Sequence, residues 1–360
     1  MNLIKLEQFL KENKQPAFRL KQIKKAVFDD AVISFDEMTV LPKDLRSALI
    51  LRQAQDADFR ILPFSAKNIL ASKDKDSYKA LLELEDGRVI ETVLLNMKEG
   101  SWSVCVSSQA GCAMKCSFCA TGAAGFFRNL TSEEIWGQVL FWRRFNLENS
   151  KRLNLPNFRI SSVVYMGMGE PFNNIDNVFE SLKVLTDKDM MGIGQRNISV
   201  STCGIVPGIE EFSKEFPQIN LAISLHAATD ELREKMMPVN KAYNLGALAE
   251  GLRKYFENSN RQVFIEYILL KDINDGEDDA RDLVKYLFDI GNRHLLHVNL
   301  IVFNPPRRTS SQVPESILQP SSRNQAEKFK NYLVDNGFDA TIRKSLGQDI
   351  EGACGQLAGK

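Results

Sequence analysis

The sequence has few cysteines, no excess of either charge and no long hydrophobic run. Six cysteines among 360 residues are too few for a disulfide scaffold. Lys and Arg (46) balance Asp and Glu (46), so the zero net charge argues against a general attraction of the surface to nucleic acid, although local basic patches remain allowed. No run of about eighteen apolar residues is present, and the opening MNLIKLEQFLKENKQ lacks the apolar stretch of a signal peptide. We therefore expect a cytoplasmic protein without a membrane segment.

The composition is that of a globular chain with a full hydrophobic core. Hydrophobic residues make up 44% and charged residues 26% of the sequence. We divide the chain into a helical basic accessory domain, a linker with a β-hairpin, a main α/β domain and a C-terminal extension. These parts span residues 1–60, 61–98, 99–310 and 311–360, respectively.

The first part is helical and locally basic. Leu6, Phe9 and Leu10 recur at helical spacing, and residues 5–25 contain seven Lys or Arg against two Glu. A solvated helix face and an RNA-binding face both have this composition. The linker that follows contains YKALLELEDGRVIETVLL at 78–95, in which two apolar-alternating runs flank Asp86-Gly87. Asp-Gly favours a tight turn, so this segment predicts a hairpin.

Strand-like and helix-like segments alternate from residue 102 onward. The predicted strands are 102–108, 160–167, 197–203, 219–226, 263–270 and 295–303. The predicted helices are 131–147, 173–187, 208–216, 244–258 and 276–289. This order indicates parallel β-α units, in either an open doubly wound sheet or a barrel. Because polar and glycine-rich stretches follow the strands, and barrels carry their chemistry at that end, we expect an α/β fold with an incomplete (β/α)6 TIM-type barrel, followed by a helix at 323–336 and a strand at 337–344.

Four of the six cysteines lie within CVSSQAGCAMKCSFC, residues 105–119. Cys112, Cys116 and Cys119 are close enough in sequence for their sulfurs to converge on one inorganic centre. Three ligands leave one coordination position open, whereas structural zinc sites are normally closed by four. A 4Fe-4S cluster would keep one iron free for a substrate. Cys105 or His226 could supply a fourth zinc ligand, so the spacing alone leaves both metals open.

The segment CAMKCSFC, with Phe118 before the last cysteine, resembles the signature of the radical S-adenosylmethionine (SAM) superfamily. The resemblance implies that Cys112, Cys116 and Cys119 hold a 4Fe-4S cluster and that SAM completes it. YMGMGEP then resembles the motif that holds the SAM amino group, with Met168 in place of its first glycine. We assign to SAM two residues of this motif and five residues at later strand ends: Gly169, Glu170, Ser201, Ser224, Leu225, His226 and Asn304. For His226 a catalytic role is the alternative to a hydrogen bond near SAM.

Across nearly the whole chain, the sequence resembles the RlmN family of dual-specificity RNA methyltransferases. The matching segments are CVSSQAGCAMKCSFCATGAAGFFRNLT, GMGEPFNN, LAISLHAAT and GACGQL. The resemblance implies methylation of carbon 2 of an adenosine in 23S rRNA and of the adenosine 3′ of the anticodon in tRNA. It also implies two SAM per turnover, an external electron donor and a disulfide reductant.

Three further residues receive roles from this resemblance. One SAM methylates Cys354, and a radical made from the second SAM activates that methyl group for addition to the ring, because carbon 2 of adenine is too electron-poor for direct transfer. Glu91 removes the ring proton. Cys105 then attacks the sulfur of Cys354, which frees the RNA and leaves a disulfide. Without the resemblance, Cys354 could equally be a small buried hydrophobe and Glu91 an exposed hairpin charge.

The RNA substrate requires an unstacked adenine and cationic contacts to phosphate. The candidate phosphate contacts are Lys21, Lys24, Lys25, Arg128, Arg307, Arg308, Arg343 and Lys344. We expect a monomer with no membrane partner. Two alternatives remain: a Cfr-type enzyme that methylates carbon 8 of the same rRNA adenosine, and a zinc-stabilised RNA-binding module without catalysis.

Overall fold

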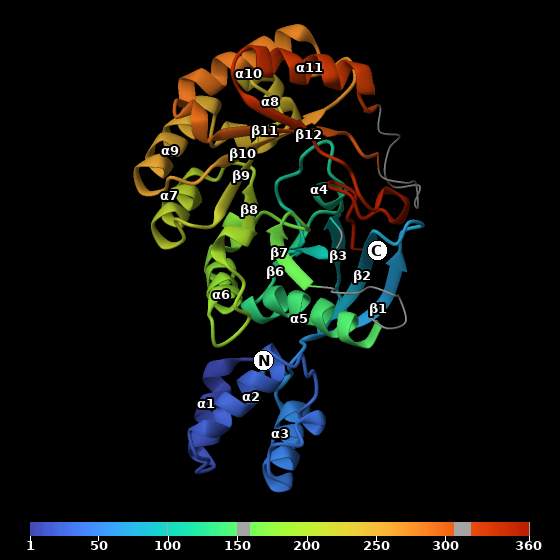
Figure 1. Cartoon of the computed structure of the whole chain (residues 1–360), viewed down its shortest axis with the longest axis vertical. Coiled ribbons are helices and arrows are strands. Elements are labelled where there is room, and N and C mark those ends of the chain that lie inside the picture. The colour runs from blue at the N-terminus through green and yellow to red at the C-terminus, as the bar shows by residue number, and fades with distance from the viewer. Residues whose placement is uncertain (99, 150–158, 306–317, 360) are drawn as a thin grey trace.

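The structure, a computed structural model, describes residues 1–98, 100–149, 159–305 and 318–359. Three helices form the N-terminal part, at the bottom of Figure 1: α1 (Leu3–Glu12), α2 (Phe18–Phe28) and α3 (Lys43–Gln55). Short 3-10 turns, η1 (Phe35–Glu37) and η2 (Ala57–Phe59), connect them to their neighbours. Asn2 begins α1, because its side chain accepts a hydrogen bond from the backbone N of Lys5 at 3.0 Å. The expected helical character of this part is thus observed.

The helical part packs against the main domain through helix α5 (Ser132–Asn149). The rings of Phe28 and Trp136 meet edge to face, with 5.5 Å between their centroids. The Arg143 guanidinium also donates a hydrogen bond to the Phe28 carbonyl at 2.8 Å. A buried aromatic pair and a charged hydrogen bond therefore join the two parts.

A single ten-stranded sheet dominates the rest of the chain, in the order β1-β2-β3-β4-β7-β8-β9-β10-β11-β12. The strands β1 (Phe64–Ala71), β2 (Ser77–Leu84), β3 (Val89–Lys98) and β4 (Ser101–Cys105) pair antiparallel. From β4 onward all pairs are parallel, through β7 (Arg159–Tyr165), β8 (Ile198–Thr202), β9 (Asn220–Ser224), β10 (Val263–Leu269), β11 (Leu296–Val302) and β12 (Asp339–Ile342). The predicted hairpin forms as β2 and β3 and extends the main sheet antiparallel. Strand β1 was not predicted.

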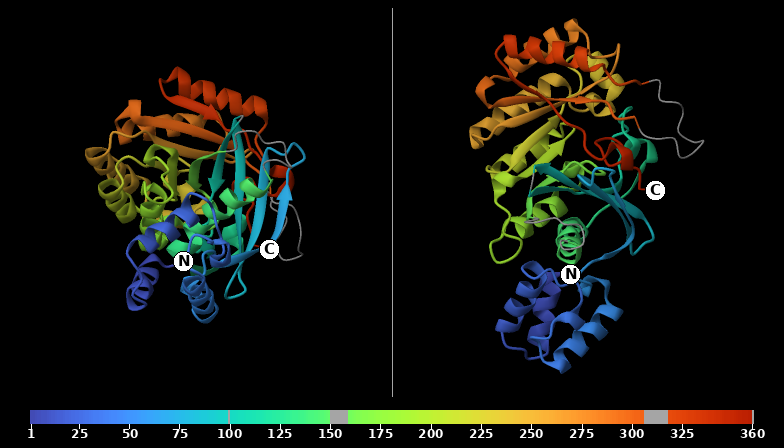
Figure 2. Two further views of the ribbon diagram at one scale, coloured as in Figure 1. Left: turned by 60° about the horizontal axis from the view of Figure 1, so that its bottom comes forward. Right: turned by 45° about the vertical axis from the view of Figure 1, so that its right-hand side comes forward.

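Helices cover the outer face of this curved sheet (Figures 1 and 2). They are α5, α6 (Ile175–Thr186), α7 (Val206–Glu215), α9 (Leu245–Asn258), α10 (Glu277–Ile290) and α11 (Arg323–Asp335), with short 3-10 turns η3 (Pro171–Asn174), η4 (Gln195–Asn197), η5 (Pro238–Lys241) and η6 (Arg293–Leu295) between elements. The short helix α8 (Asp230–Met236), which was not predicted, lies beside the cysteine loop, where the Met236 carbonyl accepts from Ser117 N at 2.9 Å. Strands β1 and β12 are the two edges of the sheet, and among the described residues no pairing closes it. The prediction of an incomplete barrel is therefore confirmed.

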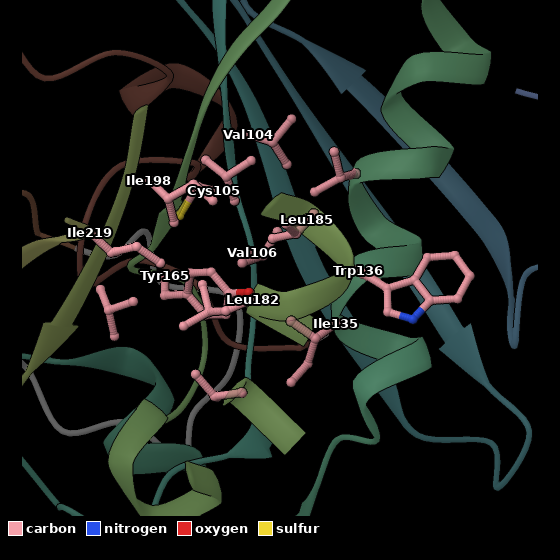
Figure 3. Packing of buried hydrophobic residues seen from close by; sticks show 14 of the residues in the cluster. Val104, Cys105, Val106, Ile135, Trp136, Tyr165, Leu182, Leu185, Ile198 and Ile219 are labelled. Atoms are coloured by element: carbon pink, nitrogen blue, oxygen red, sulfur yellow. The ribbon is translucent and has the colours of Figure 1, made fainter. Parts of the chain in front are cut away.

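Hydrophobic side chains fill the space between the sheet and its outer helices. Figure 3 shows Val104, Val106, Tyr165 and Leu182 packed together where strands β4 and β7 meet helix α6. Trp142 lies in the same core and donates to the Thr92 hydroxyl at 3.2 Å. Thr92 therefore faces α5, and its neighbours on β3 face the inside of the barrel, because strand side chains alternate.

The inner face of the sheet carries further elements that the alternating pattern did not predict. A two-stranded sheet, β5 (Gln109–Gly111) with β6 (Phe126–Asn129), flanks the cysteine loop and the short helix α4 (Ala120–Ala124). After β12 the chain returns to this face, as the red segment in Figure 2 shows, through the turn η7 (Gln348–Ile350). Nowhere in the described ranges is a helix long and apolar enough to cross a membrane.

Candidate active site

Side chains from the carboxyl ends of the parallel strands meet at a cavity of about 160 Å³ inside the barrel. Such strand ends lie at one rim of the sheet, so residues far apart in sequence become neighbours. The predicted site residues that border this cavity are Cys112, Cys116, Cys119, Gly169, Glu170, Ser201, Ser224, His226 and Cys354. The cavity therefore joins the cysteine loop to the C-terminal extension.

Backbone hydrogen bonds hold the cysteine loop in a compact shape. Cys112 N donates to the Gly125 carbonyl at 2.8 Å, and Ser117 N donates to the Met236 carbonyl at 2.9 Å. A Cβ atom at Gly122 would lie 3.2 Å from the backbone nitrogen of Cys116, so glycine lets α4 pack closely against the loop. These contacts fix the path of the chain between the three thiols.

Two thiols of the loop, those of Cys112 and Cys116, are desolvated. Burial raises the pKa of Cys112 to about 12, and burial followed by the nearby Cys119 and Cys112 sulfurs raises the pKa of Cys116. Burial thus favours the neutral form of these two thiols, and a bound metal centre would stabilise them as thiolates.

The donor set fits a 4Fe-4S cluster with one open iron. Of the two candidates for a fourth zinc ligand, Cys105 borders a different cavity. His226 already uses Nδ1 to accept a hydrogen bond from Ile268 N at 3.1 Å. In the part of the chain that the structure describes, no three His, Cys, Asp or Glu side chains lie close enough together to hold a metal ion. The assignment of Cys112, Cys116 and Cys119 as cluster ligands therefore rests on the number and chemistry of these thiols and on the single cavity that all three border.

Glu170 lies at the end of β7 with its carboxylate buried in the cavity wall. One oxygen accepts from Phe172 N at 3.0 Å and the other from Cys203 N at 2.7 Å. Burial raises the pKa of Glu170, whereas these two N–H groups lower it. Each carboxylate oxygen can accept a second hydrogen bond, so Glu170 has capacity left for a ligand ammonium group.

The glycines before Glu170 are required by close approaches of the backbone. Gly169 has φ +104°, and a Cβ atom there would lie 2.6 Å from Cβ of Gln109. A Cβ atom at Gly167 would lie 2.6 Å from the Val106 carbonyl oxygen. Met168, between them, turns its buried side chain toward β3, where its sulfur lies 3.3 Å from Glu91 N. Methionine at this position thus packs behind the cavity rather than into it.

Ser201, Ser224 and His226 line the opposite wall from the ends of β8 and β9. The two serine hydroxyls lie 3.4 Å apart. Burial lowers the pKa of His226 to about 3, followed in effect by the nearby Arg233 guanidinium. Because Nδ1 is an acceptor, the neutral ring carries its proton on Nε2, and it packs edge to face on Phe118 at 4.9 Å. This wall offers two hydroxyls and one N–H donor.

Two predicted SAM residues lie elsewhere. The Leu225 side chain is fully buried in the core, so only its backbone is near the cavity rim. Asn304 is buried at the edge of a second cavity, of about 60 Å³, and its side-chain oxygen accepts from Gln348 Nε2 at 2.5 Å. Asn304 therefore contacts the C-terminal extension.

Cys354 borders both cavities. It is exposed where the two meet, while Cys105 is buried in the wall of the second cavity. Burial and the nearby Cys354 sulfur raise the pKa of Cys105 to about 12. Surrounding protein atoms raise the pKa of Cys354 as well, whereas the Arg343 guanidinium lowers it. The structure thus places Cys354 between the cysteine loop and Cys105.

Glu91 lies on the inner face of β3 but borders neither described cavity. It is 2% exposed. One carboxylate oxygen accepts from Lys79 Nζ at 3.4 Å and the other from Ala358 N at 3.2 Å. Burial raises the pKa of Glu91, and the charge of Lys79 lowers it. The C-terminal extension therefore covers this carboxylate.

Sequence reasoning missed three buried charged residues at the site. Glu266 on β10 accepts from Arg343 Nη1 at 3.3 Å, and both border the main cavity. Arg233 of α8 is completely buried and donates to the Cys203 carbonyl at 2.6 Å and the Leu225 carbonyl at 3.2 Å. Lys79 is 4% exposed beside Glu91. For Lys79 and Glu266 the sequence held one signal, a charged residue within an apolar strand segment (YKALL and VFIEYIL, respectively).

The basic residues proposed for phosphate contacts occupy different environments. Arg343 lines the cavities, and Arg128 makes a two-pronged ion pair with Glu134 at 2.7 Å. Both cations are therefore engaged within the protein. Lys21 and Lys25 are exposed on α2, with Lys24 half-buried, and Lys344 is exposed at the rim of the second cavity. Arg307 and Arg308 lie outside the described residues.

Two family models match the chain. The model described as Radical SAM superfamily matches residues 106–284, and the model described as Ribosomal RNA large subunit methyltransferase N-terminal domain matches residues 1–53. In structure, the chain is similar to a radical SAM methyltransferase from Sphaerobacter thermophilus, with a TM-score of 0.89, 36% identity and coverage of 100% of this chain and 98% of that one.

Curated relatives carry two different names. The chain is 39% identical to "Probable dual-specificity RNA methyltransferase RlmN" of Clostridium novyi, over 99% of this chain and 95% of the relative. It is also 39% identical to "Ribosomal RNA large subunit methyltransferase Cfr" of Clostridium botulinum (strain Okra), over 98% and 96%. A "Dual-specificity RNA methyltransferase RlmN" of Campylobacter fetus is 42% identical, over 95% and 93%. A zinc-stabilised module without catalysis is therefore set aside. With its three-cysteine loop and its full-length match to these relatives, the chain belongs to the RlmN/Cfr family of radical SAM RNA methyltransferases.

Proposed function

We propose that this protein methylates carbon 2 of an adenosine in 23S rRNA and of the adenosine 3′ of the anticodon in tRNA, with Cys354 as the methyl carrier. The observation that carries the proposal is the position of Cys354, which borders the cavity of the cysteine loop on one side and the cavity of Cys105 on the other. A carrier thiol has to reach both a methyl donor and a resolving thiol.

The cavity residues divide into cofactor ligands and SAM contacts. Cys112, Cys116 and Cys119 would hold the 4Fe-4S cluster, which supplies the electron that cleaves SAM reductively. Glu170 accepts from the SAM ammonium group, and the close backbone at Gly169 leaves room for it. The remaining SAM contacts that we propose in this cavity are Ser201, Ser224, the Leu225 backbone and His226. Asn304 borders the second cavity, so a contact with SAM would require the ligand to extend past Cys354. We propose two SAM per turnover, one to methylate Cys354 and one to activate that methyl group.

Two further residues, Glu91 and Cys105, act after the methyl group has reached Cys354. Glu91 accepts the ring proton, and burial suits it to this task because it raises the pKa of the carboxyl. The tail at Ala358 has to move aside first, since its N–H occupies one Glu91 oxygen. Cys105 as a thiolate then attacks the sulfur of Cys354. The S–S bond forms as the bond from sulfur to the RNA-linked carbon breaks; the carbon keeps the electron pair and takes up a proton to become the methyl group, and an external dithiol reduces the disulfide.

Two observations support the proposed RNA substrates: residues 1–53 match an RNA methyltransferase N-terminal domain, and the relatives are named as RNA methyltransferases. Lys21 and Lys25 are exposed cations available to phosphate. We propose a monomer that acts in the cytoplasm and receives electrons from an external donor. A Cfr-type activity at carbon 8 is the second candidate, because a relative named Cfr is as similar to this chain as one named RlmN.

Product analysis tests the proposal. The protein, reconstituted with iron and sulfide under anaerobic conditions, is incubated with methyl-labelled SAM, a reductant and 23S rRNA fragments or tRNA. Digested nucleosides are compared with 2-methyladenosine and 8-methyladenosine standards, and peptides over Cys354 are analysed by mass spectrometry. We expect labelled 2-methyladenosine, and none with Cys354→Ala. Labelled 8-methyladenosine would establish the Cfr-type activity, and an unlabelled Cys354 in a turning-over enzyme would refute the carrier role.

A further inference from the structure

The loop that carries Cys354 is attached to the barrel at both ends by one buried ion pair. Lys79 Nζ lies 3.4 Å from a Glu91 oxygen, with the two side chains 5% and 3% exposed. Lys79 also donates to the Glu351 carbonyl at 3.3 Å, while the other Glu91 oxygen accepts from Ala358 N at 3.2 Å. Glu351 and Ala358 lie three residues before and four residues after Cys354.

The sheet register explains how one pair reaches both ends. Lys79 on β2 lies opposite Val93 on β3, and Val93 lies opposite Cys105 on β4. Opposite residues of antiparallel strands point to the same face, so these three share the inner face, and Glu91 joins them two residues before Val93. A Cβ atom at Gly352 would lie 3.4 Å from Val93 Cγ1, so the loop crosses directly over this row.

The loop needs such attachments because its own backbone is permissive. Glycines at 352 and 355 flank Cys354, and Gly355 has φ +82°. Glu351 has φ +53°, a left-handed conformation that is strained for a residue with a side chain. Strained residues persist where their surroundings hold them, and here the Glu351 carbonyl is held by Lys79 and Gly352 N donates to Gly347 O at 2.8 Å.

We propose that Lys79 is a positioning residue: with Glu91 it clamps both ends of the 351–358 loop and thereby fixes the Cys354 thiol between the two cavities. The clamp gives Glu91 a second role, because the carboxylate that would accept the ring proton also holds the loop that carries the methyl group. This part of the inference rests on the proposed function, whereas the clamp itself rests on the contacts alone.

Lys79→Met tests the clamp, with Lys67→Met as the matched control. Lys67 pairs with Glu83 across β1 and β2, but both side chains are largely solvated, at 48% and 35% exposure. In the cofactor-free protein we expect Lys79→Met to speed hydrogen exchange of the Ala358 amide by about 10- to 100-fold, because a charge-assisted bond loses its support. Alkylation of Cys354 by iodoacetamide should accelerate, while amides of β8 and β9 exchange as in the wild type. Lys67→Met should change neither.

A second variant and a binding measurement separate positioning from general damage. Lys79→Gln keeps a donor without the charge, so it should show a smaller increase in Ala358 exchange, and it provides the test if Lys79→Met does not fold. In the reconstituted protein, SAM affinity should stay at the wild-type value in the Lys79 variants, while the methyl load on Cys354 falls. Exchange of Ala358 and alkylation of Cys354 both within about twofold of the wild type would overturn the clamp.

The outcomes distinguish this inference from the proposed function. A wild-type protein that never methylates Cys354, yet shows the expected exchange pattern in Lys79→Met, refutes the carrier role and supports the clamp. Normal methylation of wild-type Cys354 together with unchanged exchange in Lys79→Met supports the carrier role and overturns the clamp.

Discussion

Replacement of Gly169 by alanine isolates the contribution of a close backbone approach to the candidate SAM site. Gly169 has φ +104°, and a Cβ atom there would lie 2.6, 2.7 and 2.8 Å from three atoms of Gln109. Gln109 in turn accepts from Glu170 N at 2.9 Å through its side-chain oxygen. The added methyl group therefore acts on the residue that orients Glu170.

The magnitude has two parts. A backbone with positive φ costs a residue with a Cβ atom about 1–2 kcal/mol, and a new contact inside a packed site costs about 1–3 kcal/mol. Gly87→Ala supplies the control, since Gly87 has φ +78° but no atom within 4 Å of the position that a Cβ atom would take. We expect Gly169→Ala to lower the free energy of unfolding by about 2–5 kcal/mol, and Gly87→Ala by the backbone part alone.

The assay combines urea unfolding with SAM binding by calorimetry on the reconstituted protein. Loss of the aligned Glu170 should weaken SAM binding by about tenfold or more, because a hydrogen bond to a charged group is involved. Gly87→Ala should bind SAM as the wild type does. Equal destabilisation by the two variants, or wild-type SAM affinity in Gly169→Ala, would refute the reasoning.

Three further expectations follow from buried groups. His226→Asn keeps a hydrogen-bond acceptor in a left-handed backbone position but cannot titrate. Because the pKa of His226 is lowered from 6.5 to about 3 in the folded protein, the stability that the neutral ring contributes is present above pH 6.5 and is lost by about 1.4 kcal/mol per pH unit as the pH falls. In urea titrations between pH 6.5 and 5, the variant should therefore lose less stability than the wild type. Arg233→Met should destabilise the protein by about 3–5 kcal/mol, because buried carbonyls lose their donor, whereas the exposed Arg281→Met should change stability by about 0.5 kcal/mol or less. Iodoacetamide at pH 8 should label exposed Cys354 at least about tenfold faster than Cys105, whose pKa is raised to about 12, as peptide mass spectrometry can show.

Each of these has a contrary result. Parallel acid profiles of the wild type and His226→Asn would show that the ring does not titrate on unfolding. Equal effects of the two arginine variants would show that the buried guanidinium is dispensable. Faster labelling of Cys105 would contradict its burial beneath the C-terminal extension.

Local sequence pattern was sufficient for the parallel strands of the barrel and for most of its helices, although α8 was not predicted. The apolar run 263–270 corresponds to β10 (Val263–Leu269), and the amphipathic segment 276–289 corresponds to α10 (Glu277–Ile290). Asp86-Gly87 specified the hairpin because only a few residues accept the turn backbone. By contrast, β5 and β6 were not predicted, because strands of three and four residues contain too few positions to show alternation.

The sequence alone determined the family, the three-thiol loop and the order of the β-α units, because each depends on residues that are close together in the chain. Only the tertiary structure decided which distant residues share a space. It placed Asn304 in the second cavity and Arg343 in the cavity wall, and it covered Glu91 with the C-terminal extension. The position of Lys79 in an apolar strand shows that the charge is unusual but not what replaces its water, since its partners are Glu91 on the next strand and the Glu351 carbonyl, 272 residues away.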